Sequence, residues 1–188
     1  MSSLKRLWGV VAFLALLLLV FQVSGLRQNL SLGFLHNAFL AHRLSGTLIF
    51  IALFSLGNLI QVPGWIFLAA AVLALGRVWG GVVTYLAASI SCVATFCVIR
   101  GLGGDALAQL KSPLARKLLD GLHARPVTSI ALLRLLFQTL PAVNVALAMS
   151  GVRLRQYMLG TWLGLPLPIA LYCIFFEYLA AFFGIGFH

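Results

Sequence analysis

The stretch from Ser129 to Pro166 constrains the fold most, because it is strongly apolar and yet carries polar and helix-breaking residues. Arg134, Gln138 and Pro141 are spaced so that on a helix they share one face. An arginine facing lipid near the bilayer centre costs about 2.5 to 3.5 kcal/mol or more, so this face must point into protein or a water-filled cavity. Pro141 removes a backbone donor and frees carbonyls that Asn144, Gln138, water or a ligand must satisfy. The stretch therefore predicts a broken or re-entrant helix that lines a cavity.

The amino-acid composition places the whole chain in a membrane. Of its 188 residues, 62% are hydrophobic and only 9% are charged, which exceeds the apolar content of ordinary globular domains. Runs such as Val10 to Phe21 are continuously apolar, whereas the strands of a membrane barrel alternate. We therefore expect an all-α polytopic membrane protein, with about four transmembrane helices plus two re-entrant (broken) helical hairpins in an inverted-repeat-like arrangement.

The charge balance is strongly basic, with 13 Lys and Arg against 3 acids and a net charge of +10. These cations fall in short loops, which favours anionic lipid headgroups as partners and argues against nucleic acid. No metal or cofactor is expected. His36 and His42 do not share a helical face, and the three cysteines lie inside apolar segments without the spacing of a zinc site or a disulfide framework.

Residues 1–45 are expected to form an N-terminal transmembrane helix followed by an interfacial amphipathic helix. The apolar segment Leu7 to Gly25 has helical length, and we favour a retained helix over a signal peptide cleaved near Val23-Ser24-Gly25. Polar and basic residues interrupt the next apolar stretch, Leu26 to Leu44, as in helices that lie in the membrane interface. Residues 46–183 are then expected to form the membrane domain, with a basic loop at 101–126.

A second interrupted segment precedes the one at Arg134. Gly46 to Gln61 is apolar and able to span most of a bilayer, and Pro63 follows it. Gly64 to Leu75 is too short to cross, so a re-entrant segment turning near Gly76 and Gly80 is expected. The alternative is a kinked helix that packs through these glycines. Interrupted segments in two halves of a chain point to a transporter binding site between inverted repeats.

The topology of the chain leaves a conflict open. Val82 to Ile99 has the length of a full crossing and ends at Arg100, which is expected to reach the membrane interface. The basic loop after it, with a surface helix expected to begin near Ser112-Pro113, is placed in the cytoplasm by the positive-inside rule. Lys5 and Arg6 place the N-terminus there too, but the segments expected to cross before this loop are odd in number.

The last long helix is expected from Gln156 to Phe183, kinked or started near Pro166 and Pro168. Gly160 and Gly164 are four residues apart, so they would let this helix pack tightly on the re-entrant segment at Arg134.

These breaks and glycines resemble a known family. The second half shows, in order, Arg134, Pro141, Asn144, Gly151, Arg153, Arg155, Gly160, Gly164 and Pro166. The first half shows Pro63, Gly76, Gly80, Phe96, Arg100 and Gly103. Together they resemble the DedA, or SNARE-associated (VTT-domain), membrane family. This resemblance implies movement of lipids or lipid-linked phosphates between leaflets, coupled to protons in some members. The region Asn58 to Gly81 lacks the carboxylates of those members, so the chain looks closer to the Golgi-type branch.

The predicted function is a transporter or scramblase for anionic lipids or lipid-linked phosphates, in a bacterial inner membrane. Its predicted phosphate-binding residues are Arg134, Gln138, Asn144, Arg153 and Arg155, because guanidinium groups and amides donate to phosphate oxygens. An enzyme is not expected, since Asp105, Asp120 and Glu177 form no acid–base pair. The alternative is a membrane scaffold in which Arg134 only binds carbonyls at a helix break. Whether the chain forms a homo-oligomer stays open.

Overall fold

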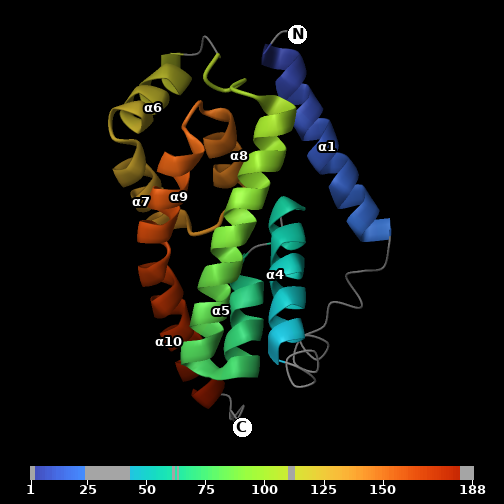
Figure 1. The fold of residues 1–188 in the computed structure, drawn as a ribbon, viewed down its shortest axis with the longest axis vertical. Coiled ribbons are helices and arrows are strands. Elements are labelled where there is room, and N and C mark those ends of the chain that lie inside the picture. The colour runs from blue at the N-terminus through green and yellow to red at the C-terminus, as the bar shows by residue number, and fades with distance from the viewer. Residues whose placement is uncertain (1–2, 24–42, 61, 63, 110–112, 183–188) are drawn as a thin grey trace.

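The computed structural model describes residues 3–23, 43–60, 62, 64–109 and 113–182, and these residues contain helices and no strand. The helices are α1 (Ser3–Val23), α4 (Arg43–Leu59), α5 (Gly64–Gly103), α6 (Pro113–Ala124), α7 (Pro126–Phe137), α8 (Pro141–Met149), α9 (Leu154–Gly164) and α10 (Pro166–Phe182) (Figure 1). The expected helical class is confirmed. The expected interfacial helix, the candidate cleavage site at Val23-Ser24-Gly25 and Pro63 lie wholly or largely outside the described residues.

Helix α5 is two antiparallel limbs rather than one rod. Gly76 has φ 77° and ψ 173°, a conformation that only glycine adopts without strain, and the chain reverses there (Figure 1). Beyond the turn, a Cβ on Gly80 would lie only 2.6 Å from the carbonyl oxygen of Ala71. Since no side chain separates the limbs at that position, the short limb from Gly64 lies directly on the long limb that ends at Gly103.

Helix α4 and the short limb of α5 form the first hairpin. They run antiparallel side by side, and the chain passes from one to the other near the middle of the molecule (Figure 1). Phe50 and Phe54 of α4 pack on Phe67 of α5, with ring centroids 6.2 and 5.0 Å from Phe67. The sequence treated these two segments separately, as a crossing and a re-entrant element. Hydropathy along the chain does not show which short segment pairs with which.

A second hairpin lies toward the other end of the molecule. Helix α6 begins at Pro113, where a helix start was expected, and is followed by α7 and α8. In Figure 1, α7 runs from the end near α6 toward the middle and α8 returns to the same end. The chain turns over residues 138–140, so the broken helix predicted around Pro141 is present, as a complete reversal.

Helices α9 and α10 follow each other down the length of the molecule, separated only by Leu165 (Figure 1). A Cβ on Gly160 would lie 2.6 Å from Cβ of Ile130, and one on Gly164 would lie 2.5 Å from the carbonyl oxygen of Ala131. Both contacts are with α7, so α9 packs closely on the second hairpin through its two glycines.

Large apolar side chains lie on the outside of this bundle, and several polar ones are buried inside it. Two helical stretches are long and apolar enough to cross a membrane, Gly64–Gly103 and Leu154–Phe176. Large apolar side chains such as Leu136 and Leu163 are 73% and 70% exposed, while Arg134 and Asn144 are fully buried. This distribution suits a lipid environment, in which polar groups avoid the surface.

Candidate functional site

Arg134 is the centre of a buried polar network. It lies in the last turn of α7 and has no exposed surface. Its Nη2 donates to the hydroxyl of Tyr157 at 2.7 Å, its Nη1 to the carbonyl of Gln138 at 2.9 Å and its Nε to the hydroxyl of Thr161 at 3.3 Å. Tyr157 and Thr161 are one turn apart on α9, so the guanidinium joins the hairpin break to α9.

Tyr157 continues the network toward the second half of the hairpin. Its buried hydroxyl lies 3.3 Å from Oδ1 of Asn144 on α8 and 3.2 Å from the carbonyl of Cys92 on α5. A phenol has one proton, so it donates to one of these acceptors while accepting from Arg134. The ring also stacks against Phe96, with centroids 4.6 Å apart, which fixes its orientation.

Asn144 then links the two hairpins directly. Its Nδ2 donates to Oδ1 of Asn58 on α4 at 2.9 Å, and Nδ2 of Asn58 donates to Oγ of Ser91 on α5 at 2.8 Å. Asn58 and Ser91 are 2% and 0% exposed. The network thus runs without interruption from Arg134 to Ser91 and includes residues of α4, α5, α7, α8 and α9.

No acidic side chain is among the described hydrogen-bond partners of Arg134, whose guanidinium is always protonated. Neutral groups stabilise the cation instead. The ring of Tyr157 lies 5.3 Å from the guanidinium carbon, within the range of a cation–π contact. The carbonyl end of α7, where Arg134 lies, adds partial negative charge. The site therefore holds a buried positive charge with only partial compensation.

The chain is strained where the second hairpin turns. Gln138 has φ 48° and ψ −121°, which a residue with a Cβ rarely adopts, and its carbonyl is held by Arg134. Nδ2 of Asn144 donates to the next carbonyl, that of Thr139, at 3.4 Å. These bonds satisfy carbonyls that the break leaves without helical partners, as the sequence predicted for Asn144.

A cavity of about 10 Å³ lies beside this turn, where the hairpin tips meet. A Cβ on Gly64, at the start of α5, would overlap the hydroxyl of Thr139, so the two tips touch here. Oγ1 of Thr84 and Nε2 of Gln138 line or border the cavity and have no hydrogen-bond partner among the described groups. The space suits about one water molecule, not a lipid headgroup.

The structure brings together Arg134, Gln138 and Asn144 of the predicted binding residues, but not Arg153 and Arg155. These two arginines lie exposed at the start of α9. The backbone N–H of Arg153 donates to Oε1 of Gln156 at 3.2 Å, so Arg153 occupies the N-cap position of α9. Their exposed positions differ from that of Arg134, which no solvent or lipid reaches in this conformation.

Sequence reasoning missed Tyr157, Asn58 and Ser91 as members of the site. Asn58 entered only as the start of a region without carboxylates, and Thr161 was given no role. A signal was present, since polar side chains inside apolar segments need partners and mark functional or structural sites. What the sequence did not contain was the pairing of Asn58 with Asn144, which are 86 residues apart.

Arg100, expected to reach the membrane interface, binds groups of the protein itself. Its Nη1 and Nη2 donate to the carbonyls of Ala148 and Val152 at 2.7 and 2.9 Å, and it forms an ion pair with Asp105. It therefore satisfies carbonyls at the turn between α8 and α9, which Gly151 makes with φ 85°. The side chain of Glu177 lies outside the described residues.

Comparison with known proteins gives one finding. The VTT domain family model matches residues 62–178, which include α5 to α9 and most of α10. No curated protein and no solved structure gives a significant match. The match concerns the domain as a whole and gives no support to the closer resemblance with the Golgi-type branch. Since it covers well over half of the sequence, the chain belongs to the VTT-domain (DedA/SNARE-associated) family of membrane-associated proteins.

Proposed function

We propose that this protein is an integral membrane protein that moves anionic lipids, or lipid-linked phosphates, between the leaflets of a bacterial inner membrane. In this proposal the two hairpins are re-entrant, one from each side, and each reverses near the middle of the bilayer. Non-helical backbone at that depth is stable only when protein buries it or when it lines an aqueous cavity. Here the tips bury each other, through Gly64 against Thr139 and Asn58 against Asn144.

This layout removes the topological conflict found in the sequence. With α4 and the short limb of α5 as a re-entrant hairpin, only α1 and the long limb of α5 cross before the basic loop. The N-terminal end of α1 and the chain after Gly103 then lie on the same side, as Figure 1 shows at one end of the molecule. A Cβ on Gly104 would lie 3.0 Å from Nη1 of Arg6, which supports this proximity.

The observation that carries the proposal is the buried charge of Arg134 at the junction of the two hairpins. Its three bonds go to neutral acceptors, whereas a phosphate would bring a full negative charge and a bidentate geometry that match the guanidinium. If the hairpins separate, a phosphate can replace the carbonyl of Gln138 and the hydroxyl of Tyr157. Transporters place substrate sites at this kind of junction, between repeats with broken helices. The present conformation is then the closed one.

The same geometry favours a second candidate function, a membrane scaffold without transport. Each nitrogen of the Arg134 guanidinium already has a partner, and the side chain is fully buried. A residue that only holds the break at Gln138 would look the same. In that case the exposed basic end of the molecule, with Arg153 and Arg155, would bind a partner protein.

Lipid movement in vesicles made with purified protein separates these functions. The probe is a fluorescent phosphatidylglycerol, and the variants are Arg134→Lys, which keeps the charge but loses the planar fork, and Arg125→Gln as a matched control. Arg125 is exposed at the start of α7 and has no side-chain bond to the helix end. Thermal unfolding in detergent shows whether each variant is folded.

Wild type and Arg125→Gln are expected to move lipid at equal rates. Arg134→Lys is expected to slow movement by at least about tenfold, because losing a charge-assisted hydrogen bond costs about 1.5 to 3 kcal/mol and each 1.4 kcal/mol is a factor of ten. If wild type moves no lipid, the transport proposal is wrong and the scaffold function takes its place. Normal movement by a folded Arg134→Lys would remove the site from the mechanism.

A further inference from the structure

Three hydroxyl side chains, those of Thr84, Ser91 and Thr95, form a hydroxyl face on the long limb of α5. Ser91 and Thr95 follow Thr84 by 7 and 11 residues, so at about 100° per residue all three point within about 20° of one direction. They are at most 2% exposed. The hydroxyls of Thr84 and Thr95 have no hydrogen-bond partner among the described groups. Since buried polar groups normally have partners, the closed conformation leaves two hydroxyls of this face unsatisfied.

The tips of the two hairpins cover the hydroxyl face. Thr84 lines the cavity of about 10 Å³ that Gln138 and Gly64 also line. Oγ of Ser91 accepts a hydrogen bond from Nδ2 of Asn58 on α4 at 2.8 Å. Figure 1 shows the long limb of α5 running past the tips of both hairpins near the middle of the molecule. Movement of the tips away from α5 would therefore uncover this face.

Beyond Thr95 the same side of the helix reaches the outside of the bundle. Val98 and Leu102 follow Thr95 by 3 and 7 residues and are 37% and 47% exposed, close to the end of α5 where the basic loop begins. From Thr84 to Thr95 the helix rises by about 16 Å at 1.5 Å per residue, which is close to half of a hydrocarbon core of about 30 Å. The hydroxyl face therefore joins the junction of the hairpin tips to the surface next to the basic loop.

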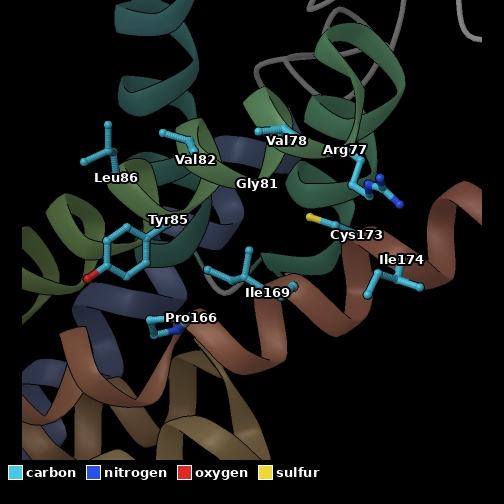
Figure 2. Close-up of a pocket in the computed structure, with 11 residues that line it drawn as sticks. Arg77, Val78, Gly81, Val82, Tyr85, Leu86, Pro166, Ile169, Cys173 and Ile174 are labelled. Atoms are coloured by element: carbon cyan, nitrogen blue, oxygen red, sulfur yellow. The ribbon is translucent and has the colours of Figure 1, made fainter.

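Another side of the long limb is largely apolar. Figure 2 shows Val82, Tyr85 and Leu86 on that side, where they line a groove of about 740 Å³ between α5 and α10. The hydroxyl of Tyr85 already donates to the carbonyl of Trp162 at 3.2 Å. A largely apolar wall offers few hydrogen bonds to water or to a headgroup, so of these two sides the hydroxyl face is the one suited to line a polar path.

We infer that the hydroxyl face lines an aqueous path that opens when the hairpin tips separate. Along this path the polar headgroup of a lipid passes between the junction at the tips and the side of the basic loop. The inference rests on the proposed function for the identity of this occupant. Neutral hydroxyls suit such a path, because they replace hydrogen bonds to water and yet bind a phosphate weakly enough for it to leave.

Replacement of threonine by valine tests the inference, because valine keeps the shape of the side chain and lacks the hydroxyl. Thr84→Val and Thr95→Val are made singly and together in the full-length protein. Ser89→Ala is the matched control. The hydroxyl of Ser89 is also buried and without a described partner, but it points about 140° away from Thr84 around the helix. Thermal unfolding in detergent and the movement of fluorescent phosphatidylglycerol in vesicles are measured for each variant.

The double variant of Thr84 and Thr95 is expected to move lipid at least about tenfold more slowly than wild type, because it lacks two hydrogen bonds that form only in the open path. It is expected to unfold at the same temperature as wild type or a higher one, since neither hydroxyl has a described partner in the closed conformation. Ser89→Ala is expected to move lipid at the wild-type rate. Normal movement by the double variant, or equal slowing in Ser89→Ala, would overturn the inference. A lower unfolding temperature of the double variant would also overturn it, because the hydroxyls would then have partners already.

Access of water to the hydroxyl face separates this inference from the proposed function. Single cysteines are introduced by Thr84→Cys, Thr95→Cys and Ser89→Cys into a protein with alanine in place of its own cysteines, Cys92, Cys97 and Cys173. A membrane-impermeant methanethiosulfonate reagent is added from the side of the basic loop. Thr84→Cys and Thr95→Cys are expected to react at least about tenfold faster than Ser89→Cys, because the thiolate is the reactive form and an apolar environment suppresses it.

The two failures then differ. Modification of Thr84→Cys and Thr95→Cys in a protein that moves no lipid keeps the aqueous path and removes lipid as its occupant. Lipid movement without modification of either one keeps transport and removes the path.

Discussion

At the scale of single residues, the hydroxyl of Tyr157 is the most connected group of the network. It accepts from Arg134 and lies within hydrogen-bond distance of both Asn144 and Cys92, with no exposed surface. Tyr157→Phe keeps the ring but leaves a guanidinium N–H of Arg134 without its partner and removes the hydrogen bond that the phenol donates to Asn144 or Cys92. We expect the free energy of unfolding to fall by about 1 to 3 kcal/mol, measured by denaturation of the purified protein.

Tyr178→Phe is the matched control for that change. Tyr178 is 73% exposed, so removing its hydroxyl should leave stability unchanged. Equal stability of Tyr157→Phe and Tyr178→Phe would show that the network does not hold the second hairpin to α9.

The bond between Asn58 and Asn144 is a direct polar link between the two hairpins, and a double-mutant cycle can measure it. Each asparagine is changed to alanine, alone and together, and unfolding is followed in detergent. The coupling energy is expected to be about 0.5 to 2 kcal/mol, as for buried polar contacts between membrane helices. Pairing Asn58→Ala with Ser150→Ala gives the control, since Ser150 bonds the carbonyl of Leu147 instead and should show no coupling.

At the scale of elements, the packing of α9 on α7 depends on the absence of side chains at two glycines. Gly164→Ala would place a Cβ 2.5 Å from the carbonyl of Ala131 and 2.7 Å from Cβ of Arg134. Because the obstacles include backbone, α9 must move away and Thr161 with it. We expect a loss of about 1 to 3 kcal/mol in the free energy of unfolding, measured as above.

Gly101→Ala is the control, because it makes the same substitution at a position where the added Cβ contacts no other group. Gly101 lies in α5 and is exposed, and a Cβ added there would meet nothing within 4 Å. Alanine there should stabilise the helix by about 0.5 to 1 kcal/mol. A stable Gly164→Ala protein would mean that the contact between α7 and α9 is looser than the structure has it.

The sequence predicted the helices and their breaks more readily than it predicted which helices pack on each other. The break after Arg134, the close-packing glycines of α9 and the helix at Pro113 follow from local signals, namely proline, small residues at a spacing of four and a cluster of polar side chains. The helix on which Gly64–Leu75 packs does not follow from such signals, because an apolar segment packs equally well on any apolar neighbour. The same holds for the site residues. Arg134 and Asn144 could be predicted, because a polar side chain that faces lipid costs free energy. Tyr157 and Asn58 could not, because only the folded structure brings them next to Asn144.

At the scale of the whole molecule, the proposed layout fixes which parts of the chain face the same side of the membrane. Cysteine labelling with a membrane-impermeant maleimide measures this in sealed vesicles, after Cys92, Cys97 and Cys173 are replaced by alanine. Single cysteines are then introduced at Lys5, Gln109 and Val78, which are all exposed.

Lys5→Cys and Gln109→Cys are expected to be labelled from the same side of the membrane, because α1 crosses it once and the long limb of α5 crosses back. Val78→Cys, at the turn of α5, is expected to label only from the other side. Labelling of Lys5→Cys and Gln109→Cys from opposite sides would mean that α4 crosses the membrane, and the two hairpins would then no longer be related as inverted halves.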